Sequence, residues 1–121
     1  MIDVSIQGSR VIFQVSESDR LWSLQSRLEI PIPHIKAATI DTHPAMGWFQ
    51  GFKVLGADVP GVFRAGTFHQ DGGLVFWDVR RPEHTIVVEL KHERYRKLIV
   101  EVADPEAVVN MINGVLAGAS A

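Results

Sequence analysis

The start of the chain alternates strictly between hydrophobic and polar residues. Residues 2–6 place apolar side chains at every second position, and residues 10–16 repeat the pattern after Gly8 and Ser9. A period of two is typical of a strand with one buried face, and two such strands joined by two residues form a β-hairpin. The sequence therefore predicts an N-terminal β-hairpin.

The same alternation returns along most of the chain. Pro31 and Pro33 stand at polar positions of one such segment, and proline cannot donate to a β-ladder, so that segment is predicted to be an edge strand or a strand end. Asp71-Gly72-Gly73 is a hairpin turn signal between two others. The further predicted strands are 27–32, 35–41, 62–70, 74–79, 85–90 and 97–102.

The last segment has a helical period. Asp104 is a good N-cap and Pro105 suits the first helical position, where its missing N–H is not needed. Apolar residues then follow at helical spacing, and Gly118 is expected to end the helix. These apolar residues are Val108, Met111, Ile112 and Val115. Seven to eight short strands followed by one helix predict a mainly β antiparallel barrel or sandwich capped by a C-terminal α-helix.

Residues 42–61 fit neither period and are predicted to form a long loop. The loop holds four residues that we select as a candidate binding site, Trp48, Phe49, Phe52 and Lys53. Aromatic side chains exposed together mark an interface or a membrane-surface contact. The alternative is that the loop folds over the β-domain and buries them, which leaves its glycines a purely conformational role.

Composition narrows the class of protein. The chain has 121 residues, a formal net charge of -2 and no cysteine. Its length suits one domain, its charge argues against general nucleic-acid binding, and disulfides and thiolate chemistry are excluded. No segment reads as a signal peptide or as the roughly 20 apolar residues of a membrane span, so we expect a cytoplasmic protein.

Motifs of catalysis, cofactor binding and metal binding are not found. The five histidines lack the spacing of a metal site, and neither a nucleophile elbow nor a phosphate-binding loop occurs. We therefore predict a protein without catalytic residues, cofactor or metal. A basic run before the last strand is interpreted as a solvated turn rather than an anion site; its members are Lys91, His92, Arg94, Arg96 and Lys97.

Glycines, prolines and aromatics between residues 15 and 112 form a wider pattern. It includes Leu21-Trp22, Trp48-Phe49-Gln50-Gly51-Phe52-Lys53, Val59-Pro60-Gly61, Ala65-Gly66-Thr67-Phe68, Phe76-Trp77-Asp78-Val79 and Asp104-Pro105-Glu106. This pattern resembles the bacterial pleckstrin-homology (PH) domain family of small uncharacterised proteins. The resemblance implies a PH-like fold, and we expect one such domain over residues 1–117. The Gly-Ala-Ser-Ala sequence at 118–121 is expected to be a frayed tail. The first hairpin turn carries a single cation, Arg10, which argues against inositol-phosphate binding there.

The resemblance implies a binding role rather than a reaction, because PH-like domains bind lipids, peptides or proteins. We expect a non-catalytic interaction module that acts through protein partners or as a homo-oligomer, using the aromatic loop or an exposed edge strand. The alternative is a small-ligand or lipid-surface binder with a pocket between the barrel and residues 43–60. In that alternative Trp77 joins Trp48, Phe49 and Phe52 in lining the pocket.

Overall fold

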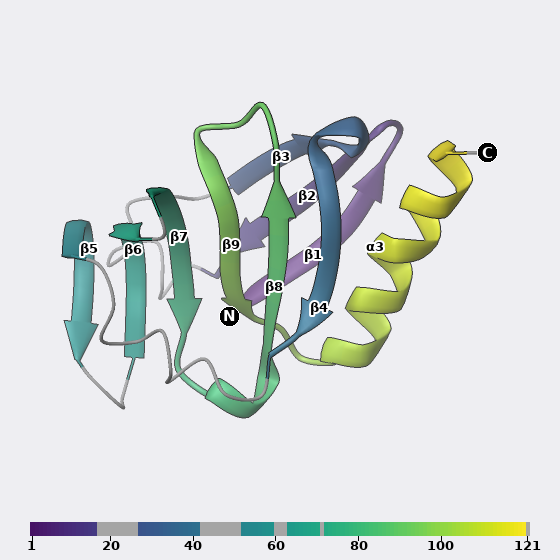
Figure 1. Ribbon diagram of the computed structural model, residues 1–121. Helices are drawn as coiled ribbons and strands as arrows, with labels where there is room; N and C mark the ends of the chain where they lie inside the picture. The colour runs from purple at the N-terminus through teal and green to yellow at the C-terminus, as the bar shows by residue number, and fades with distance from the viewer. Residues whose placement is uncertain (17–26, 42–51, 60–62, 71, 121) are drawn as a thin grey trace.

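A computed structural model describes residues 1–16, 27–41, 52–59, 63–70 and 72–120. These residues form two β-sheets and one C-terminal helix (Figure 1). The mainly β class and the terminal helix are confirmed. The two sheets are not closed into a barrel, so of the predicted barrel or sandwich the PH-like barrel is not confirmed.

The smaller sheet, sheet A, has three antiparallel strands. They are β1 (Ile2–Gln7), β2 (Arg10–Val15) and β3 (Arg27–Pro31), in the order β1-β2-β3. The predicted N-terminal hairpin is confirmed, and Gly8 supplies the positive φ of +60° that its two-residue turn requires. β3 is an edge strand, as its prolines predict.

The larger sheet, sheet B, has six strands in the order β4-β8-β9-β7-β6-β5. Their bounds are β4 (Ile35–Ile40), β5 (Phe52–Val59), β6 (Phe63–Gln70), β7 (Gly73–Val79), β8 (Thr85–Leu90) and β9 (Tyr95–Glu101). Two short 3₁₀ helices, η1 (Ile32–His34) and η2 (Pro82–His84), precede β4 and β8. The chain leaves sheet A through η1, where Pro31 and Pro33 lack the N–H groups that would continue one ladder from β3 into β4. This interruption is a physical reason why the sheets do not close into a barrel.

Sheet B departs from an antiparallel meander at one place. β9 returns from its hairpin with β8 and inserts beside β7, and the β7–β9 pair is parallel. Hydrophobic alternation reports which residues face inward but not which strands become neighbours. The purely antiparallel arrangement predicted from that alternation is therefore wrong at this pair.

β5 lies within the segment that the sequence predicts to be loop. Its ladder with β6 is irregular between Lys53 and Leu55, and Gly56 follows at once. A β-bulge inserts one residue and shifts the alternation, so the period-two signal disappears. The prediction of a loop across residues 52–59 is wrong for this reason.

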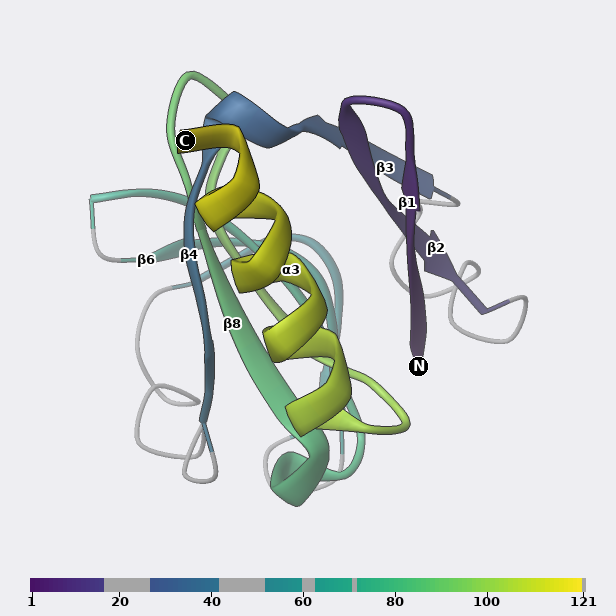
Figure 2. The ribbon, with the colours of Figure 1, turned by 90° about the vertical axis from the view of Figure 1, so that its right-hand side faces the viewer.

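The helix α3 (Pro105–Ser120) begins as expected, because the Asp104 side chain accepts a hydrogen bond from the Ala107 N–H at 3.1 Å. It continues to Ser120, so the predicted end at Gly118 is wrong. A glycine in a helix costs about 1 kcal/mol relative to alanine, which the neighbouring alanines can offset. Figure 2 shows α3 alongside β4 and β8, with sheet A set apart from them.

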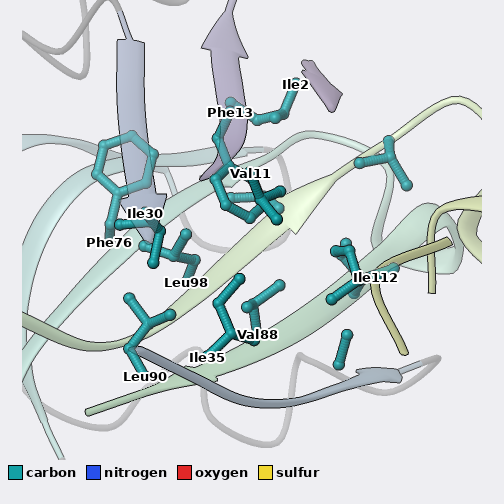
Figure 3. Packing of buried hydrophobic residues seen from close by; sticks show 14 of the residues in the cluster. Ile2, Val11, Phe13, Ile30, Ile35, Phe76, Val88, Leu90, Leu98 and Ile112 are labelled. Atoms are coloured by element: carbon teal, nitrogen blue, oxygen red, sulfur yellow. The ribbon is translucent and has the colours of Figure 1, made fainter. Parts of the chain in front are cut away.

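The main core joins sheet A, α3 and one face of sheet B, which we call the inner face (Figure 3). Phe13 of β2, Phe76 of β7, Leu98 of β9 and Ile112 of α3 all have no exposed surface. A second cluster lies on the outer face of sheet B and contains Phe68, Val75, Trp77, Val79 and Ile99. Because a cluster lies on each face of the sheet, both faces of β7 carry apolar side chains from Leu74 to Trp77.

α3 also closes one edge of sheet B. The side-chain amide of Asn113 donates to the Ala38 carbonyl at 2.9 Å, and its oxygen accepts from the Ala38 N–H at 3.2 Å. This pair of bonds imitates a neighbouring strand. Because the β4 edge is occupied at this position, addition of another strand there is blocked.

Candidate functional site

A pocket of about 210 Å³ opens at the end of sheet B where β8 turns into β9, the uppermost loop in Figure 1. We call it the basic pocket. Its charged lining residues are Lys36, Lys91, Arg96, Lys97, Glu89 and Glu93, and Leu90, His92 and Tyr95 complete the wall. Four cations face two carboxylates, a formal charge of +2 in a chain whose total is -2. Positive charge is therefore concentrated at this place.

A β-bulge delivers Lys36 to the basic pocket. The β4–β8 register is irregular between Ile35 and Ala37, which makes Lys36 the additional residue of β4. Ile35 and Ala38 both lie in the main core, so two residues separate consecutive inward positions instead of one. The bulge thereby leaves Lys36 exposed beside β8.

A second bulge delivers Arg96. The β7–β9 register steps from Leu74 opposite Tyr95 to Val75 opposite Lys97, which leaves Arg96 as the additional residue of β9. Tyr95 and Leu98 both belong to the main core, so Arg96 and Lys97 are placed between two inward positions. Two cations on adjacent positions thus reach one pocket, which regular alternation would not allow.

Gly73 makes room for the Arg96 side chain. A Cβ atom at Gly73 would lie 2.4 Å from Arg96 Cδ and 2.6 Å from Arg96 Cγ. The stem of Arg96 therefore runs across the start of β7, and a side chain at Gly73 would displace it. This contact fixes the course of the Arg96 stem, and a Cβ at the adjacent Gly72 would lie 3.2 Å from Arg96 Nη1.

The turn between β8 and β9 is held by η1. The His34 carbonyl accepts a hydrogen bond from the Lys91 N–H at 2.8 Å, and the Glu93 carboxylate accepts one from His34 Nδ1 at 2.5 Å. His92 has a φ of +59°, a left-handed conformation that disfavours residues with a side chain, and its ring lies 5.8 Å from that of His34. The turn thus keeps a strained residue in the lining of the pocket.

The opposite end of sheet B carries a buried carboxylate. Glu101 has 3% of its surface exposed and accepts three hydrogen bonds, from the Arg80 N–H at 2.9 Å, the Arg81 N–H at 3.1 Å and Arg81 Nε at 2.9 Å. Burial raises the pKa of Glu101, but these hydrogen bonds lower it by more, so the net pKa lies below the ordinary value of 4.5. The carboxylate is used to hold the turn after β7.

The residues selected from the sequence do not gather at the basic pocket. Trp48 and Phe49 lie outside the described residues. Phe52 and Lys53 are on β5, at the edge of sheet B opposite β4. Trp77, assigned to a ligand pocket in the alternative prediction, has no exposed surface, and the Arg64 guanidinium lies 4.6 Å from its ring centre and 3.7 Å from that of Phe68.

The basic run interpreted as a solvated turn is brought together more closely than expected. Lys91, His92, Arg96 and Lys97 share the pocket, while the Arg94 guanidinium lies 5.3 Å from the ring centre of Tyr95. Lys36 was not selected from the sequence. It precedes Lys91, the first residue of the run, by 55 positions (91 − 36), and only the two strand registers place it there.

The described ranges hold no metal centre. There, no group of three histidine, aspartate or glutamate side chains is arranged to hold a metal ion. Likewise, α3 is not long and apolar enough to cross a membrane.

Comparison with family models, with curated proteins and with solved structures finds no match to this chain.

Proposed function

We propose that this chain is a non-catalytic binding module whose basic pocket receives an anionic group. The observation that carries the proposal is the pair of β-bulges that bring Lys36 and Arg96 to one pocket. Each bulge interrupts a ladder, and bulges are features that re-aim side chains near functional sites. Two bulges that both place a cation at the same pocket support a ligand-binding role.

The charge distribution supports the same role. Exposed charges are screened beyond roughly 8–10 Å at physiological ionic strength, so the overall charge of -2 has little influence inside the pocket. The local excess of cations acts at short range on a group that enters it. This favours a small anionic group over a long polyanion, which would also meet the acidic remainder of the surface.

An NMR titration tests the proposal. Amide shifts on addition of phosphate, sulfate or acetate at constant ionic strength should concentrate at residues 36 and 89–97. Arg96→Gln removes the guanidinium and keeps part of its stem, and we expect it to weaken binding about tenfold, as loss of a hydrogen bond to a charged group does. Arg80→Gln is the matched control, because it removes one cation at the opposite end of sheet B. Shifts scattered over the whole surface, or equal losses in both variants, would contradict the proposal.

Self-association is a second candidate function, favoured by the contrast between the two edges of sheet B. Asn113 occupies the β4 edge, whereas among the described strands β5 pairs with β6 alone. A second copy could extend the sheet at β5. Native mass spectrometry over a dilution series, with hydrogen exchange of the β5 amides, tests this candidate. A monomer at every concentration with unchanged β5 protection would dismiss it.

The PH-like assignment is part of the proposal. A small mainly β domain that ends in one helix supports it. The open pair of sheets and the parallel β7–β9 pair count against it. The basic pocket is also remote in sequence from the β1–β2 turn with its single Arg10, so the proposed binding does not depend on the resemblance.

A further inference from the structure

We infer that the group received by the basic pocket is a phosphate group, either inorganic phosphate or a phosphomonoester, rather than a carboxylate or a sulfate. The inference rests on the proposed function and specifies its ligand. Two features of the pocket carry it: the directions from which its cations arrive and the presence of two glutamates among them.

The cations arrive from three separate segments. Lys36 comes from the β4 bulge, Lys91 from the β8–β9 turn, and Arg96 and Lys97 from β9. A planar carboxylate has two oxygens and is matched by a single arginine fork, so further cations from other directions add little. A tetrahedral phosphate presents three or four oxygens in different directions and accepts hydrogen bonds from all of these donors.

Lysine predominates among these cations. Three of the four are lysines, whose ammonium group is a compact charge with three rotatable donors. Such groups adapt to oxygens at tetrahedral angles, whereas the guanidinium imposes a planar geometry. A single arginine among three lysines therefore suits an anion with one oxygen pair for the fork and further oxygens for the lysines.

The two glutamates distinguish phosphate from sulfate. Glu89 stands opposite Lys97 in the β8–β9 register, and Glu93 is hydrogen-bonded to His34. A carboxylate in an anion pocket repels the ligand unless the ligand can donate a hydrogen bond to it. Phosphate and singly protonated phosphomonoesters retain an O–H near neutral pH, while sulfate and carboxylates do not. The mixed lining is therefore more costly for sulfate than for phosphate.

Isothermal titration of the whole chain with inorganic phosphate, sulfate and acetate at matched ionic strength tests the inference. We expect the affinity for phosphate to exceed that for acetate by about tenfold and to exceed that for sulfate by a smaller factor. Glu89→Gln removes the carboxylate that accepts from the phosphate O–H and repels sulfate. This variant should therefore bring the phosphate and sulfate affinities closer together. Glu83→Gln, at the other end of β8, is the matched control and should leave their ratio unchanged.

Gly73→Ala provides a test that removes no charge. Its Cβ would displace the Arg96 stem, so phosphate affinity should fall while the number of cations is unchanged. Gly114→Ala is the matched control, because a Cβ there meets nothing within 4 Å. A far-ultraviolet circular dichroism spectrum like that of the unsubstituted chain confirms that each variant is folded.

The outcomes distinguish failure of the phosphate inference from failure of the anion-binding proposal. Sulfate or acetate bound as tightly as phosphate would overturn the phosphate inference and leave the anion-binding proposal in place. Absence of binding by all three anions would overturn both. Vesicles of phosphatidylcholine with and without phosphatidic acid then identify the source of the group. Retention of the protein only by vesicles that contain phosphatidic acid indicates a lipid phosphomonoester. Phosphate binding without retention of the protein on either vesicle indicates a soluble ligand.

Discussion

The two ends of sheet B use charged side chains in opposite ways. At the end near η2, the Glu101 carboxylate is buried and accepts three hydrogen bonds, two of them from backbone N–H groups. At the β8–β9 turn, four cations and two carboxylates surround an open pocket. Charge at the first end fixes the backbone, whereas charge at the second end lines the pocket that we propose receives an anion.

The two ends of sheet B differ in what their charged side chains contact rather than in the types of residue present. Backbone donors have fixed positions, so a buried carboxylate that meets them loses little further entropy and stabilises the turn. Long side chains at a pocket rim stay in contact with water, and their pairs contribute little to folding. We therefore expect substitutions at the Glu101 end to change stability and those at the pocket end to change binding.

The largest effect is expected from Glu101→Gln. The amide replaces one acceptor oxygen with an NH₂ group that faces donors, so the free energy of unfolding should fall by about 2 kcal/mol. Urea denaturation followed by tryptophan fluorescence measures the change. Glu83→Gln, an exposed carboxylate near the same turn, should change it by less than about 0.5 kcal/mol. Equal effects of the two substitutions would mean that the hydrogen bonds of Glu101 contribute nothing special.

Lowering the pH should reduce the difference in the free energy of unfolding between the unsubstituted protein and Glu101→Gln. The pKa of Glu101 is lower in the folded state than its ordinary value of 4.5, so its stabilising contribution is fully present above that value. As the pH falls through the lowered folded pKa, the carboxylate is protonated and the contribution is lost. Denaturation curves of both proteins between neutral and acidic pH check this. A difference that stays constant into acid would show that the charge of Glu101 is not responsible.

At the pocket end we expect a small gain in stability from His92→Gly. Glycine adopts the φ of +59° without strain, and the free energy of unfolding should rise by about 0.5–1 kcal/mol after the added unfolded-state entropy is counted. Thermal unfolding measures the change. His69→Gly, in the extended backbone of β6, should lower stability instead. A loss of stability in both variants would mean that the His92 side chain contributes more than its conformation costs.

The smallest effect is expected from Lys36→Gln. Removing one of four neighbouring cations relieves repulsion, so stability should rise by a few tenths of a kcal/mol at low salt. The gain should vanish at high salt, because the charges are exposed and screened. Chemical denaturation at two salt concentrations measures it. A loss of stability that is independent of salt would place Lys36 in a structural role like that of Glu101.

Local features of this chain could be predicted from the sequence. The first hairpin follows from strict alternation around Gly8, the edge position of β3 from Pro31, and the start of α3 from Asp104 and Pro105. Each of these depends on residues within a few positions of one another. Local sterics and hydrogen bonding determine them, so a short stretch of sequence contains the necessary information.

Features that depend on strand pairing could not be predicted. The bulge beside Lys53 concealed β5, and the bulges at Lys36 and Arg96 concealed the pocket, because a bulge is defined by the partner strand as well as by its own residues. The basic run at 91–97 was visible, but it could be interpreted as an anion site only once Lys36 was known to lie beside it.

The parallel β7–β9 pair has a consequence for how the chain folds. The β8–β9 hairpin and the β6–β7 hairpin can each form from neighbouring residues. The pairing of β7 with β9 must wait until these two hairpins dock, which places β9 between β7 and β8. Non-local parallel pairing is slow because the loop entropy is lost before the contacts form. We therefore expect the β7–β9 boundary to be the last part of sheet B to assemble. Its amides should be the first in the sheet's centre to exchange with solvent when the folded protein opens transiently.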